Sequence, residues 1–113
     1  MNAGRIVRGS IYWVAFPDRS PRGAEIEKTR PCVCLSLDSI NAVRRTVIVV
    51  PLTTSPKTAA PIALPVPSAG KDSVAVCDQV QVVDKHRIRG EVGHLASHEI
   101  EAIENSVRTI LGL

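Results

Sequence analysis

Most of the chain consists of short apolar runs rich in β-branched and aromatic residues, separated by glycine, proline and polar segments. This pattern predicts β-strands. The run that begins at Pro31 is apolar on both faces, which is typical of a buried strand. The run 62–66 contains or adjoins three prolines and is therefore expected at a sheet edge. The expected strands are 11–16, ended by Pro17, 31–37, 45–50, ended by Pro51, 62–66 and 73–83, with a turn or single helical turn at 38–41.

The spacing of apolar residues changes near the C-terminus. From Ser97 onward they recur every three or four positions, which is the period of an amphipathic helix. Ser97 is the expected N-cap, Glu99 and Glu101 suit the positive end of the helix dipole, and Gly112 suits the helix end. We expect one domain over 1–113, with the helix packed on a sheet or small barrel.

Composition and charge narrow the classes of function only partly. The 113 residues carry a net charge of +3 and a pI near 9.0, which permits a polyanionic partner without requiring one. The single Tyr, Trp and Phe all lie within 12–16, which argues against an RNA platform with several exposed rings. No apolar run approaches the roughly 20 residues of a membrane span. No signal peptide is recognised either, so a cytoplasmic location is expected.

Cysteines and histidines show no metal-binding pattern. Three cysteines are an odd number without secretory context, which argues against a disulfide framework. Cys32 and Cys34 are expected on one face of a strand, but zinc-ligand spacings are missing. We therefore expect buried thiols, surface histidines, no metal and no cofactor.

Two segments carry more polar chemistry than a scaffold needs. The polar stretch 18–29 is interpreted as a long loop, which in a small domain is usually functional or disordered. It delivers Arg30 to the start of the buried strand, while Thr53-Thr54-Ser55 supply three hydroxyls after the third strand. If the segments meet, an arginine fork and hydroxyls form a phosphate site. The alternative is a surface ion pair of Arg30 with Glu25 or Glu27, and a plain turn at the hydroxyls.

RNA supplies its own nucleophile, the 2′-hydroxyl, so cleavage at such a phosphate site needs only a proton acceptor, a proton donor and positive charge, and neither a metal nor a cofactor. Glu25 is then a candidate for proton transfer, and Thr53 for orienting the phosphate. Arg30 carries a permanent charge and suits charge stabilisation better than proton abstraction.

Two further polar features leave alternatives open. Asp78-Gln79 interrupt an otherwise apolar strand, and a buried carboxylate must find partners. The pair either fixes a loop or faces a substrate. The basic run Lys85, His86, Arg87 and Arg89 suits RNA, an acidic partner or a solvated face.

The order and spacing of these segments resemble the MazF/PemK-type toxins. Each motif is short, but together they cover nearly the whole chain. The matching segments are 9–16 followed by Glu25, Thr29-Arg30-Pro31, 49–54, 72–74, Cys77-Asp78-Gln79-Val80, 83–85 and Gly93-His94-Leu95 with the last helix.

The resemblance implies a mainly β fold with a C-terminal helix, an SH3-like small β-barrel shared with CcdB-type toxins. It implies the toxin of a type II toxin–antitoxin system, a homodimeric, metal-independent endoribonuclease that cuts single-stranded mRNA at short sequences. The expected products are a 2′,3′-cyclic phosphate or 3′-phosphate and a 5′-hydroxyl. The implied partner is a MazE-like antitoxin whose acidic C-terminal segment folds onto the dimer.

The resemblance also assigns site residues. Arg30, Thr53 and Glu25 match the family's catalytic arginine, threonine and glutamate. Ala24 and Val76 stand where some relatives place a histidine and an arginine, so an acid–base mechanism through those groups is not available here. The expected substrate-binding residues are Lys28, Thr54, Ser55, Asp78 and Gln79.

Two other functions fit the same fold class. A CcdB-type gyrase poison needs a C-terminal tail with a tryptophan, but this chain ends Ile110-Leu111-Gly112-Leu113 and its single tryptophan is Trp13. A non-catalytic SH3-like interaction module would not need Glu25, Arg30 and Thr53 together.

Overall fold

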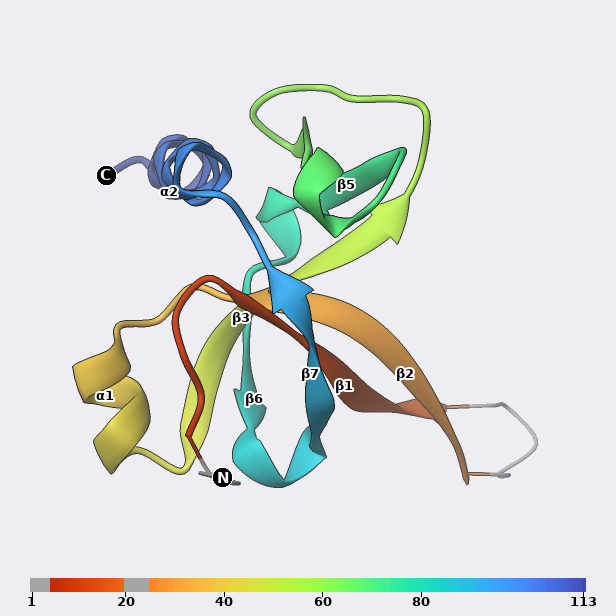
Figure 1. The fold of residues 1–113 in the computed structure, drawn as a ribbon, viewed down its shortest axis with the longest axis vertical. Coiled ribbons are helices and arrows are strands. Elements are labelled where there is room, and N and C mark those ends of the chain that lie inside the picture. The colour runs from red at the N-terminus through yellow and green to blue at the C-terminus, as the bar shows by residue number, and fades with distance from the viewer. Residues whose placement is uncertain (1–4, 20–24) are drawn as a thin grey trace.

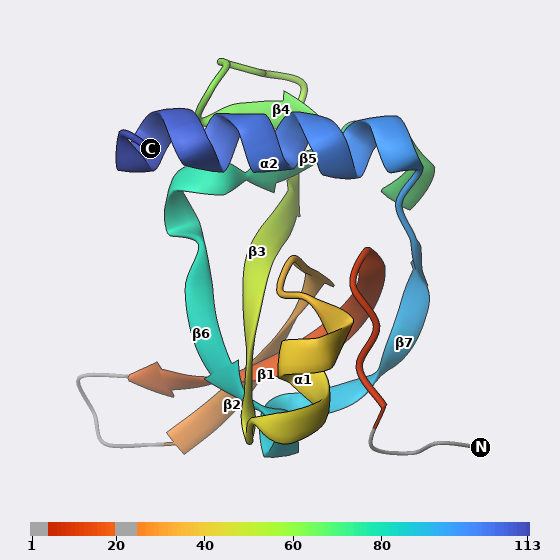
Figure 2. The same cartoon turned by 90° about the vertical axis from the view of Figure 1, so that its left-hand side faces the viewer.

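The computed structural model describes residues 5–19 and 25–113, and the side chains of 5–17 and 28–113. Its strands form one antiparallel sheet in the order β4-β5-β3-β2-β1-β7, with β6 also paired to β3. Helix α2 runs across one end of the sheet, and the short helix α1 lies beside β3 (Figure 1; Figure 2). The bounds are β1 Ser10–Arg19, β2 Glu25–Cys34, α1 Asp38–Val43, β3 Thr46–Thr54, β4 Ala63–Pro65, β5 Ser73–Val76, β6 Gln81–Asp84, β7 Ile88–His94 and α2 Ser97–Leu111, with 3₁₀ turns η1 Pro67–Ala69, η2 Cys77–Gln79 and η3 Lys85–Arg87.

The hairpin of β1 and β2 occupies most of the stretch 18–29 that was expected to be a loop. Its pairing continues outward to Arg19 opposite Glu25. Pro17 does not end β1, because β7 pairs with β1 only as far as Val14 and leaves a free edge beyond it among the described strands. A proline is tolerated at such an edge. The prediction of a loop over 18–29 was therefore wrong at both ends, where 18–19 and 25–29 belong to β1 and β2.

Strand β3 pairs with β2 along one edge and with β6 and then β5 along the other. On β3, Val49 pairs with Gln81 and Leu52 pairs with Ala75. The two β3 residues are three positions apart, whereas their partners are six positions apart. The excess forms the turn η2 near Pro51, which has no N–H to donate to a ladder. The single strand expected across β5 and β6 was wrong, and so was the expected strand end at Pro51.

The remaining elements lie close to expectation, apart from β7. Strand β4 is at the sheet edge, as predicted, and α1 is a short helix where a turn or helical turn was predicted. Strand β7 was missed because its sequence, IRGEVGH, contains two glycines and no alternating apolar pattern. No helix within the described residues is long and apolar enough to cross a membrane.

Helix α2 starts one residue from the expected position, with Ala96 instead of Ser97 as its N-cap. The buried Glu99, 3% exposed, accepts hydrogen bonds from the backbone N–H of Ala96 (2.8 Å) and of Ser68 (3.0 Å). Burial alone would raise the pKa of Glu99, but these hydrogen bonds outweigh it and lower the pKa below the usual value. Gly112 ends the helix in the left-handed conformation, with φ at 72°, as expected.

Two apolar clusters form the interior, and β3 contributes to both. Val50 and Leu52 join the cluster beneath α2, which also includes Ile103. Val47 and Val49 point to the opposite face of the sheet and join the second cluster. The mainly β fold with a C-terminal helix is confirmed. Among the described strands no ladder joins β7 to β4 or β6, so the expected small barrel fits only loosely.

Candidate functional site

Arg30 and Thr53 lie on different strands but come to the same place. The antiparallel ladder of β2 and β3 ends with Cys32 opposite Pro51. The same register, continued two residues outward, sets Arg30 across from Thr53. Both side chains are exposed. The sequence left open whether these two segments meet, and the fold brings them together.

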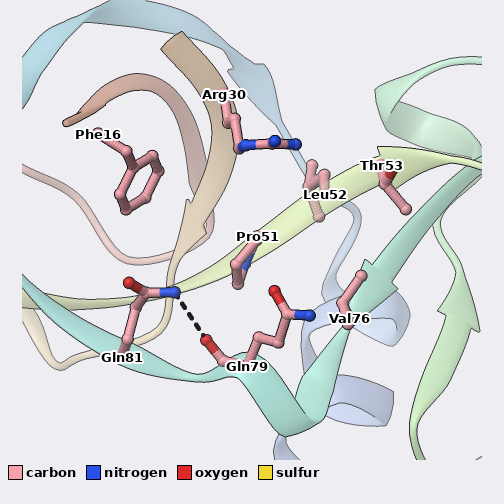
Figure 3. A pocket seen from close by; sticks show the side chains of 8 residues that line it. All are labelled: Phe16, Arg30, Pro51, Leu52, Thr53, Val76, Gln79 and Gln81. Atoms are coloured by element: carbon pink, nitrogen blue, oxygen red, sulfur yellow. Dashed lines mark hydrogen bonds between the residues drawn. The ribbon is translucent and has the colours of Figure 1, made fainter. Parts of the chain in front are cut away.

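One hollow of about 410 Å³ is lined by both residues. Figure 3 shows the Arg30 guanidinium extending from β2 toward Leu52 and Thr53. Gln79 extends from the turn η2 toward Pro51, so the hollow is bounded by β2, β3 and η2. Its other lining residues are Phe16, Val76 and Gln81.

The polar groups of this hollow are mostly donors. They comprise one guanidinium, the Thr53 hydroxyl and the side-chain amides of Gln79 and Gln81. The Gln81 amide donates from Nε2 to the backbone carbonyl oxygen of Gln79 at 3.1 Å. No carboxylate or histidine is among the described lining residues. Guanidinium and hydroxyl donors suit phosphate oxygens. The arrangement can therefore bind a phosphate ester and stabilise negative charge on it.

Asp78 occupies a different environment from the one expected. It lies in η2 and is exposed, so the expectation of a buried carboxylate inside a strand was wrong. The cause is the looped-out turn near Pro51, which carries Asp78 away from the ladder. Asp78 does not line this hollow, whereas its neighbour Gln79 does.

The other predicted site residues are distributed around this centre. Lys28 is exposed, pairs with Phe16 in the hairpin, and precedes Arg30 by two residues, which places both on one face of β2. Thr54 lines a second hollow, described below. The Ser55 hydroxyl accepts a hydrogen bond from the Lys57 N–H at 3.1 Å and so fixes the turn after β3.

Glu25 is the first residue of β2, and its side chain lies outside the described residues. Five strand positions separate it from Arg30, which corresponds to about 17 Å along an extended strand.

A second hollow of about 450 Å³ adjoins the first and shares Arg30, Leu52 and Thr53 with it. Trp13, which is 43% exposed, and Pro31 are among its lining residues and are register partners on β1 and β2. The sequence reasoning missed Trp13. Trp13 could have been noticed from its place on the first strand. Its relation to Arg30 could not, because it depends on the β1–β2 hairpin, in which Val14, the neighbour of Trp13, pairs with Arg30.

The three cysteines are free and buried, as expected. Burial raises the pKa of Cys32 to about 12, although the positive charge of Arg30 acts in the opposite direction. Burial also raises the pKa of Cys77 to about 11, and it raises that of Cys34. The histidines His86, His94 and His98 are exposed, as expected. In the part of the chain that the structure describes, no three His, Cys, Asp or Glu side chains are grouped to hold a metal ion.

The fold is an antiparallel sheet with a terminal helix, and its candidate site is a donor-rich hollow bounded by two adjacent strands and a turn. A family model described as "PemK-like, MazF-like toxin of type II toxin-antitoxin system" matches residues 7–111. The chain belongs to this family. It is 30% identical over 112 residues to Endoribonuclease MazF of Staphylococcus saprophyticus, and the match covers 94% of this chain and 91% of that protein.

Solved structures agree on the fold. An endoribonuclease from Mycobacterial species superposes with a TM-score of 0.77 at 22% identity, covering 96% of this chain and 93% of that one. The MazE–MazF structure (Form-III) from Deinococcus radiodurans superposes with a TM-score of 0.80 at 19% identity, covering 96% and 98%.

Proposed function

We propose that this toxin is an endoribonuclease that cuts single-stranded RNA at short sequences without a metal ion. The observation that carries the proposal is the placement of Arg30 and Thr53 across one hollow by the β2–β3 register. The 30% identical relative is itself named an endoribonuclease, which agrees with this reading of the site.

In the proposed reaction the RNA 2′-hydroxyl oxygen forms a bond to the adjacent phosphorus, and the bond from phosphorus to the 5′-oxygen breaks. The 2′-hydroxyl proton passes to an acceptor, and the leaving 5′-oxygen takes up a proton. The products are a 2′,3′-cyclic phosphate, which water can open to a 3′-phosphate, and a 5′-hydroxyl. Arg30 stabilises the extra negative charge at phosphorus, and the Thr53 hydroxyl orients a phosphate oxygen.

Glu25 is our proposed proton acceptor, because it matches the family's glutamate and the first hollow has no described carboxylate or histidine in its lining. With about 17 Å of extended strand between Glu25 and Arg30, this role requires the outer end of β2 to fold back toward the phosphate when RNA binds.

The substrate-binding residues would act on either side of Arg30. Lys28 lies two positions away on the same face and suits the next phosphate along the strand. Gln79 contributes amide groups beside the reacting phosphate, and Thr54 contributes a hydroxyl in the adjoining hollow. Asp78 and Ser55 line neither hollow and would contact RNA at its periphery.

We further propose a homodimer and a MazE-like antitoxin as its partners. The Deinococcus radiodurans neighbour is a MazE–MazF structure. An acidic antitoxin segment would suit the donor-rich hollow and the net charge of +3, and it would block RNA by ordering on the toxin surface.

The test is incubation of purified protein with a long single-stranded RNA in EDTA, with cut sites mapped by primer extension. Arg30→Ala is expected to lower the cleavage rate by at least about 100-fold, the scale of losing one charge-stabilising donor. Arg44→Ala is the matched control, because Arg44 is also exposed but lines neither hollow. Glu25→Gln in the same assay tests the proton acceptor.

Sequence-specific cuts that persist in EDTA and are lost only with Arg30→Ala would support the proposal. Equal rates for parent and Arg30→Ala proteins would place the site elsewhere. The absence of cutting by folded protein across varied RNAs would exclude the ribonuclease function.

A further inference from the structure

Trp13 is a large aromatic side chain that the fold leaves 43% exposed in the middle of a strand. Its cross-strand partners are Pro31 on β2 and Gly90 on β7. Gly90 has no side chain, and a Cβ built there would meet nothing within 4 Å, so β7 is open to solvent at this position. Large aromatic rings are usually buried, and an exposed ring beside a cavity commonly serves recognition.

The hollow beside Trp13 has the chemistry of a site for a flat ring with a polar edge. Its volume of about 450 Å³ lies within the range of small-molecule sites, about 300–1,000 Å³. Its apolar lining residues are Ile11, Trp13, Pro31, Leu52, Ala69 and Val92.

Hydroxyl groups supply the polar part of the same hollow. Thr54 and Ser73 are register partners on β3 and β5, and Thr29 lies on β2. Thr54 is exposed and Ser73 is half-buried, and neither hydroxyl is bonded to another residue in the part of the chain that the structure describes. A hydroxyl can donate or accept, so these groups are free to bond the edge of a bound ring.

The position of the hollow connects it to the phosphate site. It shares Arg30, Leu52 and Thr53 with the first hollow, so these three residues border both hollows. A phosphate held by Arg30 would therefore have the Trp13 hollow within reach of a base attached to a neighbouring sugar. Single-stranded nucleic acids are bound in this way, with phosphates on cations and bases stacked on aromatic rings.

We propose that the hollow lined by Trp13 receives one base of the RNA next to the cut phosphate. The base would stack on the indole, and the Thr29, Thr54 and Ser73 hydroxyls would contact its edge. This inference rests on the proposed ribonuclease function and adds a specificity-determining subsite to it.

The first measurement needs no change in the hollow. Trp13 is the single tryptophan of the chain, so tryptophan fluorescence reports this hollow alone. The parent protein is titrated with an RNA fragment that spans a mapped cut site and carries a 2′-deoxy sugar there, which removes the nucleophile and leaves the fragment uncut. We expect saturable quenching of the emission. Replacing the bases one at a time by abasic sites should abolish the quenching at a single position flanking the cut.

The second measurement is kinetic. Trp13→Ala is expected to raise KM for the RNA about 5- to 150-fold, the effect of losing one stacked base, with a smaller change in kcat. Trp13→Phe should recover most of this loss because it restores an aromatic face. The control is Ile40→Ala, because Ile40 is similarly exposed at 48% but lies on α1, outside both hollows.

The outcomes separate this inference from the function on which it rests. Cleavage with no change in Trp13 emission at saturating RNA, or with an unchanged KM for folded Trp13→Ala protein, would overturn the base subsite and leave the nuclease standing. Base-dependent quenching, together with no cleavage of unmodified RNA by the parent protein, would support the subsite and exclude the nuclease. Quenching by the antitoxin but not by RNA would assign the hollow to the antitoxin and overturn the inference.

Discussion

Glu99 holds the start of α2 to the turn η1, and we predict that Glu99→Gln weakens the fold. The two carboxylate oxygens serve different donors, with Oε1 accepting from the Ala96 N–H and Oε2 from the Ser68 N–H. A glutamine has one oxygen, so it can keep one of these bonds, and its amide N–H₂ then faces the other N–H. The substitution therefore removes one charge-assisted hydrogen bond and creates a clash of donors.

The magnitude follows from these two contacts. A hydrogen bond to a charged group contributes about 1.5–3 kcal/mol to the free energy of unfolding. Water can reach the partly buried Ser68 N–H and offset some of the loss. We expect a loss of about 2 kcal/mol, which lowers Tm by roughly 8 °C for a domain of this size. This is a considerable part of the about 5–15 kcal/mol that stabilises a typical domain.

The assay is urea unfolding of both proteins at equal concentration, at pH 7 and at several lower pH values. Because the pKa of Glu99 is lowered by folding, its contribution is present above the usual 4.5 and is lost as pH falls through the folded pKa. The difference between parent and Glu99→Gln should therefore shrink below about pH 4.5. The control is Glu101→Gln, an exposed residue in the same helical turn. Equal losses for the two variants would refute the reasoning.

Two further predictions concern stability and reactivity. Gly9→Ala should lower the free energy of unfolding by roughly 2–5 kcal/mol, measured in urea, because φ is +88° and the new Cβ would lie 2.5 Å from Ile100 Cδ1; unchanged stability would contradict this packing. The cysteines of the folded protein should resist a thiol reagent at pH 8, since burial raises the pKa of Cys32 to about 12 and of Cys77 to about 11. All three should react in denaturant, and fast labelling of the native protein would show that the thiols are accessible.

The sequence predicted the parts of the fold whose pattern is local. The first strand and α2 followed from β-branched and helical spacing, and Gly112 ended the helix where expected. The break near Pro51 depends on which strand lies opposite, and this information is not local. The same is true of β7, whose glycines and charges give no strand signal and which is ordered by pairing with β1.

The candidate site shows the same division. Arg30 and Thr53 could be named from residue type and family resemblance, but their juxtaposition depends on the β2–β3 register. Asp78 was misplaced for a related reason, because its burial was judged from a strand that the fold interrupts. Trp13 was counted only as a scarce aromatic. Its role as a candidate binding residue depends on its cross-strand partners Gly90 and Pro31, which come from two other strands.

Because β3 contributes to both apolar clusters, the fold limits the ways in which the toxin can be inactivated. Val47 and Val49 anchor β3 in one cluster, and Val50 and Leu52 anchor it in the other. Thr53 follows directly on this doubly anchored segment, so Thr53 cannot be displaced without loosening both halves of the interior. Local melting around Thr53 would cost nearly as much as global unfolding. A protein built in this way is best silenced from outside, by a partner that occupies its surface.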